Sequence, residues 1–163
     1  MQLQNLIQKI HEDCFVLCTQ ALGKYLPVAG NIGIFCQSEN DFDIYTKIKE
    51  EITYPSDNPN QKYFELKIPI IIRSSGDVPE ATYTHLYIRK PHINSPEAGD
   101  IDFVLPVSEY LQLKRRITNG EKIEGASIYD RPGWDNIEIR NPEIDALAYI
   151  STQEMAEKVR VKF

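Results

Sequence analysis

Two pairs of matching segments restrict the fold of this 163-residue chain more than any other feature. Residues 88–93 (IRKPHI) return as residues 139–144 (IRNPEI), and residues 99–103 (GDIDF) echo residues 30–34 (GNIGI). Each copy is expected to run strand, helix, strand and then the strand that ends in I-R-x-P-x-I. Repeats of this size must stack to bury their sheet faces, so residues 30–93 and 99–151 are expected to form a shared sheet or a pair of sheets within one domain.

Apolar periodicity predicts the elements around these copies. Residues 2–22 carry an apolar stripe at helical spacing, which ends at Gly23. Strand-like alternation and turn residues divide the rest of the chain. Further helices are expected at 39–52 and 108–117 and at the start of 153–163, and strands at 31–37, 63–72, 83–89, 100–105, 123–130, 135–140 and 146–151. The predicted fold class is α+β, with a long N-terminal helix and a mostly antiparallel sheet.

Composition excludes several classes of function. A net charge of −6 argues against a protein that binds the phosphate backbone of nucleic acids. No apolar run approaches the length of a membrane span, and the N-terminus lacks the basic start of a signal peptide, which predicts a cytoplasmic protein. The three cysteines contain no C-x-x-C pair, and core packing is expected for them.

Polar side chains alternate with apolar ones along three of the predicted strands. They form the sets His85-Tyr87-Arg89, Asp100-Asp102 and Asn136-Glu138-Arg140. Because successive residues of a strand point to opposite faces, each set shares one face. One hypothesis is a ligand-binding site in which Arg89 and Arg140 bind an anion, with His85, Tyr87 and Asp102 beside it. The alternative is the solvated face of an antiparallel sheet.

The same sets contain residues that could act as acids and bases or bind a metal. His85 with Asp102 or Glu138 could form an acid–base pair, or the three could hold a divalent cation such as Mn, Fe or Zn. The spacing selects none of these metals. His11, in the polar triplet HED, is expected to be solvated, and Trp134 lies in a predicted tight turn.

The order of the elements, with N-I-E-I at 136–139, resembles the vicinal oxygen chelate superfamily, the glyoxalase and bleomycin-resistance type. That resemblance implies two β-α-β-β-β modules paired into a cup. The family places a His or Gln early in the first strand of each module and a Glu in the last strand. Glu138 matches the Glu position, whereas the first copy has Tyr87 there and the first strands offer Asn31 and Asp100.

Three functions follow as hypotheses. The first is a small-molecule binding domain for an anionic ligand. The second is a metal-dependent lyase, isomerase or dioxygenase of the vicinal oxygen chelate type, which uses Glu138, His85 and Asp102. The third is an interaction module that forms a homodimer through residues 2–22, while the basic residues Lys158, Arg160 and Lys162 of the tail contact a partner.

Overall fold

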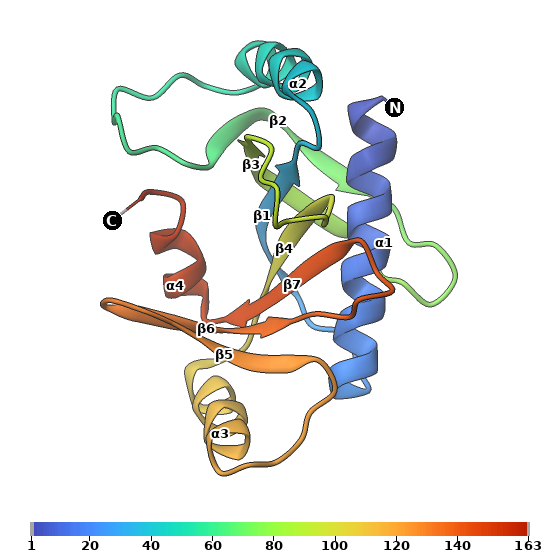
Figure 1. The fold of residues 1–163 in the computed structure, drawn as a ribbon, viewed down its shortest axis with the longest axis vertical. Helices are drawn as coiled ribbons and strands as arrows, with labels where there is room; N and C mark the ends of the chain where they lie inside the picture. The colour runs from blue at the N-terminus through green and yellow to red at the C-terminus, as the bar shows by residue number, and fades with distance from the viewer. Residues whose placement is uncertain (1, 163) are drawn as a thin grey trace.

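A computed structural model describes residues 2–162 of the chain. Its described part folds around one seven-stranded sheet, with helices on both faces and at both ends (Figure 1). The helices are α1 (Leu3–Leu22), α2 (Glu39–Ile52), α3 (Val107–Thr118) and α4 (Gln153–Lys158). The strands are β1 (Val28–Phe35), β2 (Phe64–Ile72), β3 (Ala81–Arg89), β4 (Gly99–Val104), β5 (Ala126–Arg131), β6 (Trp134–Ile139) and β7 (Ala146–Ser151).

The strands lie in the order β2-β3-β1-β4-β7-β6-β5. The neighbours β1 and β3 are parallel, as are β4 and β7, and the other four pairs are antiparallel. The sheet is therefore mixed but mostly antiparallel, and the expected α+β class is confirmed. The first half of the chain runs β1-α2-β2-β3 and the second runs β4-α3-β5-β6-β7, so the second half has one additional strand.

The predicted alignment of the two I-R-x-P-x-I segments is wrong at the level of strands. β3, which ends at Arg89, lies next to the central strand β1, and the strand in the same place beside β4 is β7. The segment that contains Arg140 follows β6, which lies one strand further out. Alternation of apolar residues fixes which face a side chain takes, but it carries no information on the lateral order of strands. The halves correspond in element order, with β3 matching β7.

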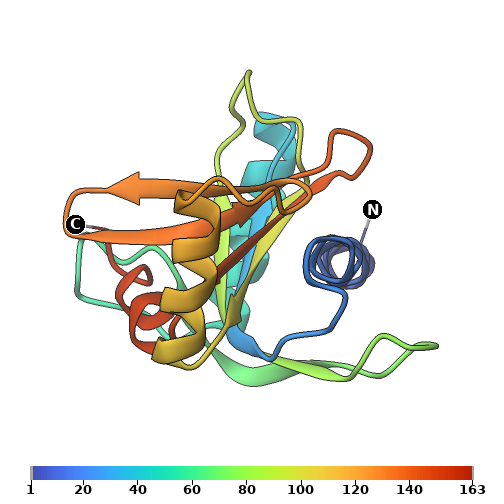
Figure 2. The same cartoon turned by 90° about the horizontal axis from the view of Figure 1, so that it is seen from below.

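The N-terminal helix α1 covers one face of the sheet (Figure 2). Its apolar stripe is buried in the core of the chain, at Leu3, Ile7, Ile10, Cys14, Phe15, Leu17 and Cys18. The stripe on which the homodimer hypothesis rested is therefore used within the chain, and Val16 is the large apolar side chain that stays exposed on α1. Gly23 ends the helix with a φ of 69°, a left-handed conformation that favours glycine.

His11 also differs from its expectation, because it is buried and not solvated. Its Nδ1 lies 2.7 Å from the hydroxyl of Tyr83 on β3, and its ring lies against Phe15. Burial lowers the pKa of His11 to about 4, so this imidazole is neutral in the folded protein.

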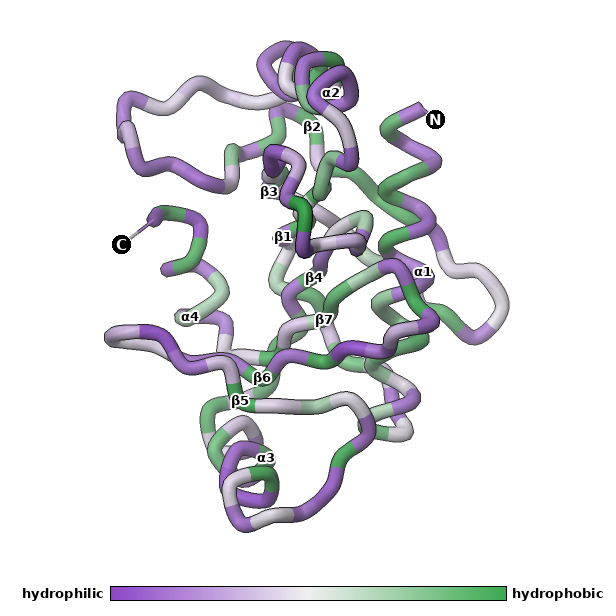
Figure 3. The backbone as a smooth tube through the Cα atoms, in the orientation of Figure 1, coloured by the Kyte–Doolittle hydropathy of each residue, from purple (hydrophilic) through white to green (hydrophobic). Residues whose placement is uncertain are grey.

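The other face of the sheet carries α4 and the C-terminal segment, while α2 and α3 lie at opposite ends of the molecule (Figure 1). The loop between α2 and β2 extends on the same side as α4 and is mostly hydrophilic (Figure 3). Backbone hydrogen bonds join this loop to the C-terminal segment, for example from the N–H of Tyr63 to the carbonyl of Arg160 at 3.0 Å. No helix within residues 2–162 is long and apolar enough to cross a membrane.

Candidate ligand-binding site

The strand register places the predicted polar sets on one face of the sheet. Asn31 pairs with His85 and Gly33 pairs with both Tyr87 and Asp100, so their side chains share a face. Asp102 pairs with Tyr149 on β7, and Tyr149 pairs with Glu138 on β6. This is the face opposite Ile32 and Ile101, which belong to the apolar core. The prediction that the polar side chains of each of these strands share one face of the sheet is therefore correct.

A hollow of about 680 Å³ opens on this polar face, and we call it the central hollow. The sheet forms its base, the β5–β6 hairpin forms one wall, and the C-terminal segment with the residues before β2 forms another. Its lining residues are Phe35, Lys62, Tyr63, Tyr87, Arg89, Asp100, Asp102, Tyr129, Arg131, Pro132, Trp134, Asn136, Tyr149, Val159, Val161 and Lys162. Its volume lies in the range of small-molecule sites.

Two buried carboxyl groups from β4 line the hollow. Asp100 and Asp102 are 6% and 5% exposed, which contradicts the alternative of a fully solvated sheet face. The hydroxyl of Tyr63 donates a hydrogen bond to Oδ1 of Asp100 at 3.3 Å. The amide nitrogen of Asn31 donates to Oδ2 of Asp102 at 2.8 Å. Both carboxyl groups are thus held by neighbouring side chains, as buried polar groups require.

Burial raises the pKa values of both acids. For Asp102, burial is the larger cause, the neighbouring Asp100 adds to it, and the pKa rises to about 7. The pKa of Asp100 is raised by burial, and the charges of Lys62 and Arg89 partly oppose this. Two carboxyl groups that approach each other away from water ionise less readily than either would alone. The pair therefore carries less than two full negative charges near neutral pH.

Four basic side chains line the same hollow, at Lys62, Arg89, Arg131 and Lys162. The guanidinium of Arg89 stacks on Phe35, with its central carbon 3.4 Å from the ring centre. The ammonium of Lys62 lies 5.0 Å from the ring centre of Tyr87. Stacking on a ring holds a cation in place and leaves its N–H groups able to bind an anion. The lining therefore carries an excess of positive charge.

Asn31 on β1 connects the base of the hollow to the C-terminal segment. Its Nδ2 donates to Asp102 and also to the carbonyl of Ala156 on α4 at 2.7 Å. Its Oδ1 accepts a hydrogen bond from Nε of Arg160 at 2.8 Å. Arg160 is therefore engaged within the chain, whereas the third hypothesis expected it to contact a partner.

The predicted metal set of His85, Asp102 and Glu138 is not assembled. These residues lie on β3, β4 and β6. In the sheet, β1 lies between β3 and β4, and β7 lies between β4 and β6. Two strand spacings amount to about 10 Å, whereas a shared metal needs ligand atoms about 2 Å from one point. Among residues 2–162, no group of three His, Cys, Asp or Glu side chains has the geometry of a metal site.

His85 itself does not line the hollow. Its Nδ1 lies 2.9 Å from the hydroxyl of Thr84. Burial, followed by the charge of Arg160, lowers its pKa. Its imidazole is therefore mostly neutral at pH 7, and the expected pairing with Asp102 or Glu138 is not formed.

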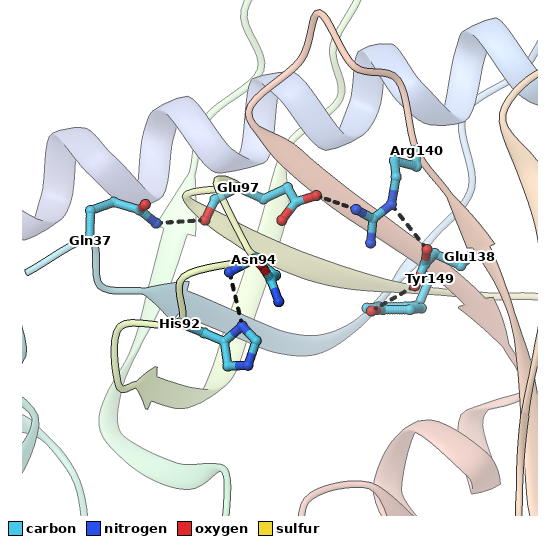
Figure 4. A network of polar contacts seen from close by, with 7 residues as sticks. All are labelled: Gln37, His92, Asn94, Glu97, Glu138, Arg140 and Tyr149. Carbon is cyan, nitrogen blue, oxygen red and sulfur yellow. Dashed lines mark hydrogen bonds and ion pairs between the residues drawn. The ribbon is translucent and has the colours of Figure 1, made fainter.

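Arg140 and Glu138 also lie outside the hollow, and the structure separates Arg140 from Arg89. Nη1 of Arg140 donates to Glu97 at 2.6 Å, and its Nε donates to Glu138 at 3.2 Å (Figure 4). The other oxygen of Glu138 accepts a hydrogen bond from the hydroxyl of Tyr149. Arg140 is thus paired within the chain, so the prediction of two equivalent anion-binding arginines is wrong.

Glu138 does not lie on the strand that the family resemblance implies. The last strand of the second half is β7, and Glu138 lies on β6. On β7 the residues that face the hollow's side are Leu147, Tyr149 and Ser151, and on β3 the corresponding residue that lines the hollow is Tyr87. The last strand of each half thus contributes a tyrosine, Tyr87 or Tyr149, to the lining of the hollow.

Sequence reasoning identified only part of the lining. Tyr87, Arg89, Asp100, Asp102 and Asn136 were predicted on the polar face and line the hollow. Phe35 on β1 and Tyr149 on β7 also line the hollow, and the other lining residues come from the loop before β2, the β5–β6 hairpin and the C-terminal segment, which meet only in three dimensions. One signal was present in the sequence: basic residues lie close to aromatic ones at 62–63 and 129–134, and they alternate with valines at 159–162.

No family model and no curated protein sequence matches the chain. Among solved structures, one described as "Structural Genomics, Protein EC4020" matches with a TM-score of 0.52 and 13% identity, over 95% of this chain and 93% of that one. This likeness shows a shared fold.

Two solved structures of the type that the element order indicates are also similar. One is a glyoxalase/bleomycin resistance protein/dioxygenase superfamily member from Vibrio splendidus 12B01, with a TM-score of 0.37 and 7% identity. The match covers 78% of this chain and 100% of that chain. The other is a methylmalonyl-CoA epimerase variant from Streptomyces coelicolor in complex with 2-nitronate-propionyl-CoA, with a TM-score of 0.33, 16% identity, and 78% and 99% covered.

Proposed function

We propose that the protein binds a small organic anion in the central hollow. The charge of the lining supports this proposal, because four basic side chains face two acids whose ionisation is suppressed by burial. A hollow with this balance attracts anions and concentrates them.

The observation that carries the proposal is an unpaired hydrogen-bond donor on Arg89. Its Nε is buried and has no hydrogen-bond partner among the described residues, although its guanidinium is fixed against Phe35. A buried donor without a partner costs free energy, and a carboxylate or phosphate would satisfy it in a charge-assisted hydrogen bond. The protein thus holds in place a donor that an anionic ligand can use.

A thermal-shift assay tests this proposal with pairs of charged and neutral compounds, namely 1-naphthoate against 1-naphthamide and phenyl phosphate against phenol. We expect the two anions to raise the melting temperature and the neutral compounds to leave it unchanged. Arg89→Met keeps an apolar stem on Phe35 but removes the donors, so the anion effect should be lost.

Arg73→Met is the matched control, because Arg73 is exposed in the loop after β2. This variant should respond to the anions as the unmutated protein does. The proposal fails if neither anion stabilises the protein, or if the Arg89→Met variant responds like the Arg73→Met variant.

A further inference from the structure

The wall formed by the β5–β6 hairpin contains a buried hydrogen-bond acceptor that nothing in the described chain satisfies. Asn136 on β6 lines the central hollow and is 6% exposed. Its Oδ1 has no hydrogen-bond partner among residues 2–162. Buried polar atoms are nearly always paired, so an unpaired one in the lining of a hollow indicates a donor supplied by a ligand.

Two aromatic rings flank this acceptor. Tyr129 on β5 is directly opposite Asn136 in the antiparallel pair, and Trp134 is two residues before it on the same face of β6. Both rings line the hollow. The guanidinium of Arg131 lies 4.3 Å from the ring centre of Tyr129. A flat ligand ring can therefore stack beside Trp134, or on the face of Tyr129 away from Arg131, while its edge donates to Asn136. The amide of Asn matches the N6/N7 edge of adenine, with which it forms two hydrogen bonds.

The rest of the lining suits the other parts of a nucleotide. The carboxyl groups of Asp100 and Asp102 are acceptors that can bind sugar hydroxyl groups, as acidic residues do in dinucleotide sites. Arg89, Lys62 and Lys162 supply the positive charge that a phosphate needs. Ring, hydroxyl and phosphate recognition thus all occur in one hollow of about 680 Å³.

We propose that the ligand of the central hollow is a mononucleotide whose base carries an exocyclic amino group, with Asn136 as the residue that selects the base. This inference rests on the proposed function and narrows it from organic anions to one chemical class. Asn136 accepts a hydrogen bond from the amino group, Tyr129 and Trp134 hold the ring, and the basic residues bind the phosphate.

Calorimetric titration of the full-length protein with four compounds tests the inference. The compounds are AMP, IMP, which replaces the amino group by a carbonyl, adenosine, which lacks the phosphate, and ribose 5-phosphate, which lacks the base. We expect AMP to bind about tenfold or more tightly than each of the others, in line with the cost of losing a good base contact. Quenching of Trp134, the only tryptophan, should accompany AMP binding.

Asn136→Leu should bring the affinity for AMP down to that for IMP, while Tyr129→Phe, which keeps the ring, should preserve the preference. The four-ligand comparison on the unmutated protein decides the question even if the Asn136→Leu variant does not fold. Equal affinities for AMP and IMP, or tighter binding of IMP, overturn the inference. If ribose 5-phosphate and 1-naphthoate then still bind through Arg89, the anion site stands without the nucleotide. If no anion binds, both proposals fall.

Discussion

Asn31 donates a hydrogen bond of 2.8 Å to Oδ2 of Asp102, and this contact joins the two central strands on the polar face of the sheet. Asn31 is 1% exposed; its Nδ2 also donates to the carbonyl of Ala156 on α4, and its Oδ1 accepts a hydrogen bond from Arg160. One amide therefore holds a buried acid at the base of the central hollow and the C-terminal segment that forms one of its walls.

Replacing Asn31 by leucine should destabilise the protein by about 2–4 kcal/mol, because Asp102 and Arg160 each lose a buried partner. The C-terminal segment should also open more often, which hydrogen exchange at the amides of α4 would report as faster exchange. Asn5→Leu on the exposed side of α1 is the control and should change neither quantity by much. Unchanged exchange in α4 would show that Asn31 does not hold this segment.

The raised pKa of Asp102 predicts a specific dependence of stability on pH. In the folded protein the pKa is about 7, whereas a carboxyl group in the unfolded chain has a pKa near 4. Between these values the folded state holds a proton that the unfolded state has released. The contribution of this group to the free energy of unfolding therefore falls as the pH rises from about 4 to about 7, and is constant above that range.

An Asp102→Asn variant keeps an acceptor for Asn31 and removes this titration. From pH 5 to pH 8, the free energy of unfolding of the variant should therefore rise relative to the unmutated protein by about 2 kcal/mol. Urea unfolding at several pH values measures the difference. Asp43→Asn, at an exposed position of α2, is the matched control for the loss of one carboxyl group. A flat difference for Asp102→Asn, equal to that of the control, would refute the raised pKa.

The sequence predicted most elements to within a few residues, and it predicted correctly that Tyr87, Arg89, Asp100 and Asp102 share one face. Both successes depend on local periodicity, which is a property of each strand alone. The lateral order of the strands is not local, so Arg140 was placed with Arg89 although it pairs with Glu97. The burial of His11 was missed for a similar reason, since its partner Tyr83 is 72 residues away.

Two glycines allow the central strands to approach closely. A Cβ on Gly99 would overlap the backbone oxygen of Gly33, and a Cβ on Gly33 would overlap Oδ1 of Asp100. Backbone cannot move without breaking the β1–β4 pairing, whereas the Asp100 side chain can rotate towards the hollow. We therefore expect Gly99→Ala to cost about 3 kcal/mol or more, and Gly33→Ala about 1–2 kcal/mol, in urea unfolding. The opposite order would show that the two strands are further apart.

The contact between His11 and Tyr83 should contribute to stability, because both side chains are buried and their hydrogen bond measures 2.7 Å. Tyr83→Phe leaves Nδ1 of His11 without a partner and should lower the free energy of unfolding by about 1–2 kcal/mol. Tyr54→Phe, at a half-exposed position, is the matched control and should have little effect. Equal stabilities of the two variants would mean that the His11 contact contributes nothing.

The most direct test of anion binding in the central hollow follows the Nε–H group of Arg89 by proton–nitrogen NMR during a titration with AMP. The signal is assigned by its loss in the Arg89→Met variant. We predict that it moves to a lower field and saturates as the anion occupies the partner position that is empty among the described residues. An Arg89 signal that stays in place up to millimolar AMP, 1-naphthoate and phenyl phosphate would contradict this assignment of function.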